Sequence, residues 1–213
     1  DPMWLGLAAS RPCYNLDPYL SGKEEIRATV ARHMGANPHP NPPPGGRGQT
    51  WDEVSRAATI GLIEGNKGLH DGLDLDGSNS NAALAASIAT PVVLVLDARG
   101  MTRGIAPLIL GYQAFDRNVR IAGVILNRLG GSRHESKLRA VIDHYTGVPV
   151  LGALQNDEQL TIVERHLGLV PSNEAGAARS RVEAIGKMVA AHVDLERLLA
   201  LAREAPPLPT AGI

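Results

Sequence analysis

Short apolar runs, separated by segments with a helical pattern, constrain the fold of this chain most strongly. The runs lie at residues 58–63, 91–96, 121–126 and 148–152. Strands that are apolar on both faces are typical of parallel sheets, in which helices cover both sides. The sequence therefore predicts an α/β fold with an open, mostly parallel sheet and helices on both faces. It also predicts that the runs around Ile60, Val93 and Val124 are interior strands.

Helical patterns alternate with these runs. Ile26, Val30 and Met34 recur every four residues, which predicts a first helix over residues 23–35. Further helices are predicted at residues 81–90, 104–115 and 133–145, and a long alanine-rich helix is predicted at residues 174–203. Strands that alternate with helices favour right-handed crossovers within one sheet.

Two segments interrupt the pattern. Residues 36–50 are rich in proline and glycine, which excludes a helix or a central strand there. We interpret this insert as an exposed loop, and the alternative is a polyproline-type recognition segment. Pro206, Pro207 and Pro209 follow the last predicted helix, so residues 204–213 are expected to be an interdomain linker after a domain at residues 1–203.

Composition excludes several classes of protein. The 213 residues include 21 basic and 22 acidic side chains, and this balance argues against nucleic-acid binding by charge. No apolar run approaches the ~20 residues of a membrane span, and no signal-peptide pattern opens the chain. Cys13 is the only cysteine, so an internal disulfide and a cysteine-based zinc site are both excluded. A cytoplasmic location is the expectation.

Polar and small residues follow the apolar runs, where ligands bind in open parallel sheets. They are Glu64, Gly65, Gly68, Asp71, Asp97 and Asn127. An acidic residue at the end of a buried strand is a common place for a Mg²⁺ ligand beside a nucleotide phosphate. We favour a functional role for Glu64, because glycines and a second carboxylate follow it. For Asp97, a solvated strand end is an equal alternative.

Other segments are better explained by a structural role than by metal binding or catalysis. Residues 72–81 lack the glutamate of a calcium loop, and they are interpreted as a loop that ends in a helix N-cap at Ser78, Asn79 or Ser80. His134 is expected to be a surface residue at a helix start. The chain contains no Gly-x-x-x-x-Gly-Lys-Ser/Thr phosphate loop.

Several segments together resemble the cobyrinic acid a,c-diamide synthase family. The segment IEGNKGLHDG at residues 63–72 resembles the signature of that family, and RPCYNLDP at residues 11–18 resembles a second motif. The segments at residues 91–100, 121–128, 149–154 and 164–171 follow in the order of the family. The resemblance covers nearly the whole chain except the insert at residues 36–50.

The resemblance implies a fold like dethiobiotin synthetase and the P-loop NTPases, with ATP and Mg²⁺ as cofactors. It implies that the enzyme phosphorylates the a and c side-chain carboxylates of cobyrinic or hydrogenobyrinic acid in cobalamin biosynthesis. Ammonia from a separate carboxy-terminal glutaminase domain then forms the amides. The implied partners are thus a corrin-type tetrapyrrole and that glutaminase domain. A homodimer is left open.

The resemblance also implies roles for single residues. Glu64 matches a glutamate that handles Mg²⁺ and carboxylates, and Asp71 matches an aspartate near the macrocycle carboxylates. Asn127 matches the residue that reads adenine. Asp1 matches the second aspartate of a "GPDYxDP" motif and is a candidate metal ligand. Gly65, Gly68 and Asp97 belong to the loops that would surround the cofactor.

The chain departs from the family pattern at both ends. The phosphate loop and the glutaminase domain are both absent, so we expect a domain truncated at its N-terminus and inactive alone. One alternative is the amidation of another tetrapyrrole, such as sirohaem or nickel-sirohydrochlorin. Another is a non-catalytic, degenerate NTPase-like binding module. A partitioning-type ATPase is a weaker hypothesis, because residues 15–18 and 164–171 have no role there.

Overall fold

The computed structural model describes residues 2–34, 60–162, 164–165, 168–169 and 178–206. Asp1, the insert at residues 36–50 and residues 207–213 of the expected linker lie outside this part. The chain divides into two compact units. One unit comprises Asp1–Asn15 and Pro91–Leu201, and the other comprises Leu16–Thr90 and Ala202–Ile213. Each unit is described by itself below.

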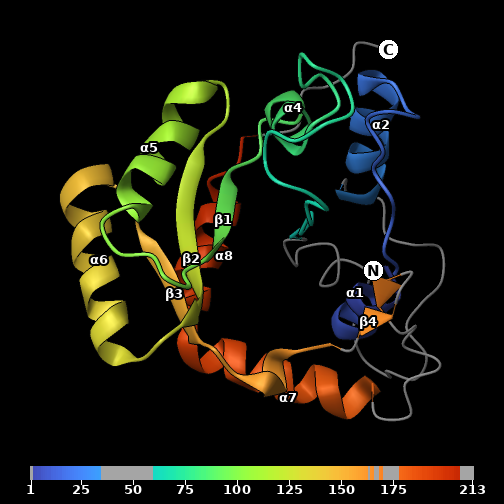
Figure 1. Cartoon of the computed structure of the whole chain (residues 1–213). Helices are drawn as coiled ribbons and strands as arrows, with labels where there is room; N and C mark the ends of the chain where they lie inside the picture. Colours follow the sequence, from blue (N-terminus) through green and yellow to red (C-terminus); the bar gives the residue numbers. More distant parts are fainter. Residues whose placement is uncertain (1, 35–59, 163, 166–167, 170–177, 207–213) are drawn as a thin grey trace. The chain divides into compact units, whose positions relative to one another are not determined.

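The first unit is built on a parallel sheet of three strands, β1 (Val92–Asp97), β2 (Ile121–Leu129) and β3 (Val150–Gln155) (Figure 1). The strands lie in the order β1-β2-β3, and Asp97 at the end of β1 is in register with Asn127 of β2. Parallel pairing brings the carboxyl ends of these neighbouring strands to the same edge of the sheet. The predicted α/β fold with a parallel sheet is therefore confirmed.

Helices cover both faces of this sheet (Figure 1). Helices α5 (Ile105–Phe115) and α6 (Ser132–Thr146) lie on one side, and α8 (Leu195–Arg203) lies on the other. Helix α7 (Ala178–His192) runs below the sheet in this view and leads into α8. The aliphatic core is fully buried, and its large side chains include Ile105, Ile109, Val124, Leu126, Leu138 and Ile142. The predicted helices at residues 104–115 and 133–145 are confirmed.

The predicted interior strand around Ile60 is wrong. Residues 60–63 form no strand, and the side chain of Leu62 is 86% exposed. A strand needs a backbone partner as well as apolar residues, and none of the described strands pairs with this run. The prediction of an interior strand around Val93 is also wrong, because β1 lies at an edge of the described sheet and Val95 is 62% exposed. The run around Val124 forms the central strand β2, as predicted.

The predicted single helix at residues 174–203 is also wrong, because the chain breaks between α7 and α8. Val193 forms an antiparallel bridge with Gly152 of β3, and the Asp194 N–H donates to the Leu151 carbonyl at 2.7 Å. The Asp194 carboxylate then accepts the Arg197 N–H at 2.9 Å and caps α8. The contact with the sheet thus overrides the helical propensity of the segment.

The second unit contains α2 (Lys23–Met34) and α4 (Asn81–Ser87). Both were predicted, although α4 ends earlier than expected. The Arg27 Nε donates to the Ser87 carbonyl at 2.8 Å and links the two helices.

Four short elements of the first unit were not predicted. They are α1 (Pro2–Ala9), the 3-10 helix η1 (Glu158–Leu160), and the antiparallel pair β4 (Glu164–Arg165) and β5 (Gly168–Leu169). Among the described residues, no helix has the length and apolarity of a membrane span.

Candidate functional site

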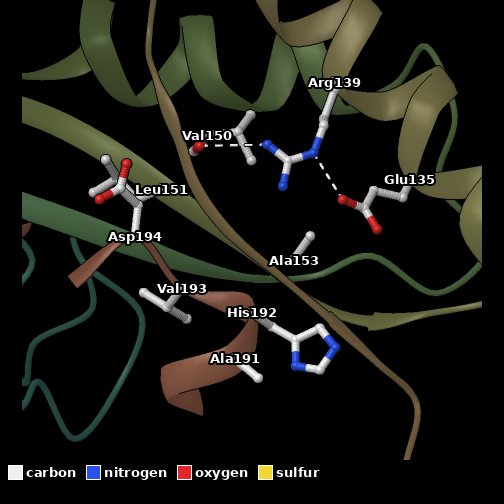
Figure 2. A pocket seen from close by; sticks show the side chains of 9 residues that line it. All are labelled: Glu135, Arg139, Val150, Leu151, Ala153, Ala191, His192, Val193 and Asp194. Atoms are coloured by element: carbon white, nitrogen blue, oxygen red, sulfur yellow. Dashed lines mark hydrogen bonds and ion pairs between the residues drawn. The ribbon is translucent and has the colours of Figure 1, made fainter. Parts of the chain in front are cut away.

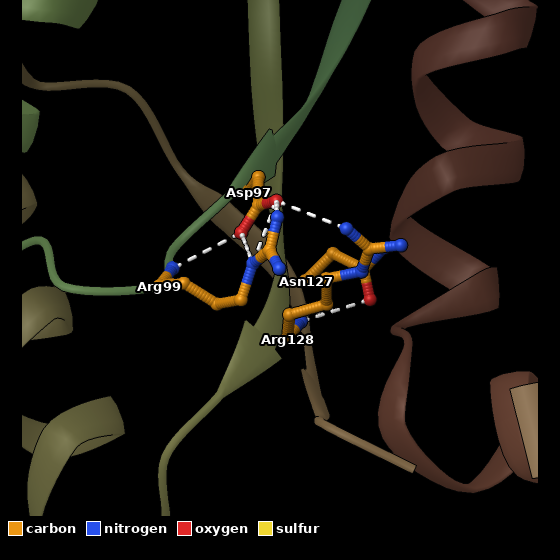
Figure 3. A network of polar contacts seen from close by, with 4 residues as sticks. All are labelled: Asp97, Arg99, Asn127 and Arg128. Carbon is orange, nitrogen blue, oxygen red and sulfur yellow. Dashed lines mark hydrogen bonds and ion pairs between the residues drawn. The ribbon is translucent and has the colours of Figure 1, made fainter. Parts of the chain in front are cut away.

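The carboxyl ends of β1 and β2 place Asp97 beside two arginine side chains (Figure 3). Asp97 Oδ1 accepts the Arg99 N–H at 3.1 Å, which closes a turn of the Asx type. Gly100 follows with φ +68°, a conformation that favours glycine. This turn bends the Arg99 side chain back over the strand end.

The Asp97 carboxylate is fully engaged by these arginines. Arg99 Nη2 donates to Asp97 Oδ2 at 2.6 Å, and Arg99 Nε lies 3.0 Å from each carboxylate oxygen. Arg128 Nη1 donates to the same Oδ2 at 3.2 Å. These hydrogen bonds, chiefly those from Arg99, hold the pKa of Asp97 well below its usual range. Asp97 is therefore an internal counter-ion for two guanidinium groups.

Arg128 reaches Asp97 from an unusual backbone conformation. Its φ is +58°, in the left-handed region that side chains other than glycine rarely adopt. Asn127 Oδ1 accepts the Arg128 N–H at 2.9 Å and supports the turn (Figure 3). The Asn127 carbonyl also accepts the Ala98 N–H at 2.8 Å, which ties the ends of β1 and β2 together.

In the second unit, Gly68 and Asp71 lie in one tight turn. The Asp71 N–H donates to the Gly68 carbonyl at 3.1 Å, and a Cβ at position 68 would overlap the Asp71 carboxylate. Glu64, Gly65, Gly68 and Asp71 are all exposed. The structure thus keeps the glutamate and the aspartate on one accessible loop.

Asn81 organises this loop, and the sequence reasoning missed it. Its Nδ2 donates to the Lys67 carbonyl at 3.1 Å and lies 3.4 Å from the Gly68 carbonyl. A Cβ at Gly65 would lie 2.9 Å from the same Nδ2, so Gly65 leaves room for the Asn81 amide. The only signal in the sequence is the position of Asn81, the first residue of a capped helix.

The segment at residues 72–80 is a hydrogen-bonded loop, as predicted. Asn79 Oδ1 accepts the Leu73 N–H at 2.8 Å, and Asn79 Nδ2 donates to Asp74 Oδ2 at 2.8 Å. The Ser78 N–H donates to Asp76 and lowers the pKa of that carboxyl. Ser80 caps α4 by accepting the Ala83 N–H at 3.1 Å, which confirms one of the three predicted caps.

His134 connects the loops that follow β1 and β2. Its Nε2 lies 2.6 Å from the Met101 carbonyl, and its Nδ1 lies 3.1 Å from the Gly130 nitrogen. Because a backbone N–H can only donate, Nδ1 is the acceptor and Nε2–H is the donor. His134 lies in the first turn of α6, as predicted, and its side chain is only partly exposed.

A shallow pocket lies elsewhere, at the outer edge of β3 (Figure 2). Arg139 donates to Glu135 Oε1 at 2.8 Å and to the Val150 carbonyl at 3.4 Å across this pocket. The other lining residues are Leu151, Ala153, Ala191, His192, Val193 and Asp194. None of the predicted site residues lines this pocket.

The described residues do not form a complete metal site. No group of three or more histidine, cysteine or acidic side chains among them is placed to hold a metal ion. Asp97 does not fit a Mg²⁺ ligand, because guanidinium groups occupy both of its oxygens. Glu64 is exposed, and Mg²⁺ often takes one or two protein carboxylates together with substrate phosphates.

A comparison with known families defines the class of protein. The family model for the AAA domain matches residues 47–163, which is more than half of the chain. The chain belongs to this AAA domain family.

Relatives extend the similarity over nearly the whole chain. It is 40% identical over 208 residues to the cobyrinate a,c-diamide synthase of Magnetococcus marinus, a match that covers 98% of this chain and 40% of the relative. It is also 40% identical, with the same two coverages, to the hydrogenobyrinate a,c-diamide synthase of Thermobifida fusca. The resemblance read from the sequence is confirmed. The chain spans about two fifths of the length of these curated relatives, and no solved structure matches it significantly.

Proposed function

We propose that this chain is the ATP-binding part of an enzyme that amidates the a and c side-chain carboxylates of cobyrinic or hydrogenobyrinic acid. The observation that carries the proposal is the 40% identity over 98% of the chain to a cobyrinate a,c-diamide synthase. Membership of the AAA domain family supports ATP as the nucleotide.

The proposed reaction begins at a substrate carboxylate, whose negative charge makes it a poor acyl donor. One carboxylate oxygen attacks the terminal phosphorus of ATP, and ADP leaves. Ammonia then attacks the acyl carbon, inorganic phosphate leaves, and the nitrogen loses a proton to give the amide. When bound, Mg²⁺ screens the phosphate charge during the first step.

The residues of the exposed loop take two roles in this proposal. Glu64 lies on the side of the metal and phosphates, because it is the first residue of the glycine-rich loop. Asp71 positions the side chain of the macrocycle. Gly68 leaves room for the Asp71 carboxylate, because it has no Cβ. Asn127, at the end of β2, reads the adenine base.

The remaining parts of the proposal concern the whole enzyme. Residues 1–203 form the amidoligase domain, and residues 204–213 link it to a glutaminase domain that supplies ammonia. The enzyme works in the cytoplasm, and a homodimer is its proposed assembly.

The test is a chimera in which this chain replaces the matching two fifths of the Magnetococcus marinus relative. We expect formation of the a,c-diamide from hydrogenobyrinic or cobyrinic acid, dependent on ATP and glutamine. Glu64→Gln should lower kcat by roughly 100-fold, as for other lost electrostatic contacts. Asp71→Asn should instead shift the product toward one amide.

Matched controls lie outside the site. Glu183→Gln and Asp143→Asn change exposed carboxylates on α7 and α6, and both should leave rate and products unchanged. A chimera that folds and binds substrate but makes no amide would reject the proposal and favour a non-catalytic binding module. Normal turnover in both loop variants would reject the site.

A further inference from the structure

Two guanidinium groups converge on one oxygen atom at the carboxyl edge of the sheet (Figure 3). Arg99 comes from the turn after β1 and Arg128 from the last residues of β2, yet both donate to Asp97 Oδ2, at 2.6 and 3.2 Å. Because they share this oxygen, the two cations lie close together and repel each other. Asp97 offsets only one of the two positive charges.

We propose that Arg99 and Arg128 form a binding site for an oxyanion of the ligand, a phosphate or a carboxylate group, and that Asp97 positions them. The inference rests on the proposed function, which supplies the two ligands considered. These ligands are ATP and the carboxylate-bearing tetrapyrrole.

The arginines keep donors that Asp97 does not use. Arg99 binds Asp97 through Nε and Nη2, and Arg128 binds it through Nη1 alone. Among the described residues, no hydrogen bond or ion pair is formed by Nη1 of Arg99 or by Nε and Nη2 of Arg128. Their side chains are 62% and 50% exposed, so a ligand can reach these donors. Guanidinium donors in a planar fork match phosphate and carboxylate oxygens.

The backbone at Arg128 is a second, independent observation. A φ of +58° costs free energy for a side chain that has a Cβ, and glycine would adopt it without that cost. A guanidinium group held at this cost at the carboxyl edge of the sheet indicates a role for the side chain. The neighbouring Asn127 holds the turn through the Arg128 N–H at 2.9 Å.

The first experiment measures binding to the 213-residue chain by NMR of the arginine Nε–H groups. ATP without added metal is titrated in one arm, and hydrogenobyrinic acid in the other. We expect the signals of Arg99 and Arg128 to shift in at least one arm, which also identifies the source of the oxyanion. Arg117, exposed near the start of β2, is the internal control. No shift in either arm, or equal shifts at Arg117, would overturn the proposal.

The second experiment separates binding from stability. Arg128→Gly should keep or raise the melting temperature, because it relieves the positive φ, and should weaken oxyanion binding by about tenfold or more. Ala89→Gly is the matched control, because Ala89 has a similar φ of +52° and no charge. Its oxyanion affinity should equal that of the wild type. Unchanged affinity in both Arg128→Gly and Arg99→Gln would reject the site.

The two proposals can fail separately. If the chimera makes the diamide and Arg99→Gln and Arg128→Gly leave its KM values unchanged, the oxyanion site is wrong and the proposed function stands. If the chimera is inactive while the NMR shifts depend on both arginines, the oxyanion site stands and the proposed function fails.

Discussion

At the scale of single residues, the charge of Asp97 is the main determinant of the strand-end site. Its carboxylate accepts hydrogen bonds from a backbone N–H and from two guanidinium groups. All three side chains are substantially exposed, so the ion pairs contribute little to the free energy of folding. Their effect is to fix the direction of the arginine side chains.

The titration of Asp97 tests this arrangement. Its pKa should lie well below the ordinary value of about 3.9, and Arg99→Gln should raise it more than Arg128→Gln, because Arg99 makes the larger contribution. A depressed folded-state pKa means that this contribution to stability is complete above about pH 4 and is lost as the pH falls through the folded pKa. NMR of the carboxyl carbon measures the pKa, and an unchanged value in both variants would contradict the network.

Gly68→Ala tests the packing of the exposed loop. The new Cβ would overlap the Asp71 carboxylate, which can rotate away at little cost because it ends a short side chain on the surface. We expect the stability to change by less than about 0.5 kcal/mol, whereas the product distribution of the chimera should change as in Asp71→Asn. Urea denaturation and product analysis measure the two effects. A wild-type mixture of products would show that the position of Asp71 is unimportant.

At the scale of elements, His134 couples the loops that carry the strand-end residues. The α6 helix supplies this histidine, and its two ring nitrogens bind the loop after β1 and the loop after β2. Gln155, the last residue of β3, also contacts the loop after β2, because its Oε1 accepts the Gly131 N–H at 2.9 Å. The edge of the sheet is therefore braced by side chains as well as by the strands.

Replacing His134 by alanine should destabilise the chain by about 1–3 kcal/mol, because the half-buried Met101 carbonyl and the exposed Gly130 N–H both lose their partner. The comparison is Lys137→Ala, an exposed position on the same helix, which should change stability by less than about 0.5 kcal/mol. Urea denaturation measures both. Equal stability of the two variants would mean that water replaces the histidine without cost.

Replacing two glycines by alanine, Gly186 in α7 and Gly152 in β3, should change the stability of the chain in opposite directions. Gly186 lies inside α7 with nothing within 4 Å of an added Cβ, so Gly186→Ala should stabilise by about 0.5–1 kcal/mol. A Cβ at Gly152 would lie 2.7 Å from Val193 Cγ2, so Gly152→Ala should cost about 1–3 kcal/mol. Thermal unfolding measures both changes. A stabilising Gly152→Ala would contradict the described contact with Val193.

What the sequence could predict follows from the range of the interactions involved. The helices at residues 23–34 and 105–115 depend on periodicity, which is local. The break at Val193 depends on a contact with Gly152, far away in the sequence, and periodicity carries no trace of it. The run at Ile60 has the composition of a strand, but composition does not provide a backbone partner.

The candidate site divides in the same way. The positions of Asp97 and Asn127 at adjacent strand ends could be predicted, because parallel strands end at one edge. That two arginines would occupy the Asp97 carboxylate depends on side-chain directions, including the positive φ of Arg128, which the residue type disfavours. Asn81 and His134 form hydrogen bonds with backbone groups. Such contacts do not depend on the type of the partner residue, so no sequence motif indicates them. The assignments of Glu64, Asp71, Gly65 and Asn127 stay predictions.

At the scale of the whole molecule, the missing phosphate loop should limit nucleotide affinity. Such loops provide most of the backbone N–H donors for the β- and γ-phosphates of ATP, and the chain contains no such motif. We expect the Kd of the isolated chain for Mg·ATP to lie far above the micromolar range. The chimera should bind Mg·ATP more tightly than the isolated chain. Calorimetric titration compares the two. Micromolar affinity of the isolated chain would contradict the expectation.

The exposed edge strand β1 also affects how the chain behaves at high concentration. Its residues before Asp97 are all apolar. Edge strands commonly carry a charged side chain that disfavours pairing with a strand of another molecule, and these residues have none. With Val95 open to solvent, this strand is the segment of the described sheet from which aggregation is expected to start. Val95→Lys is therefore expected to raise the solubility of the isolated chain.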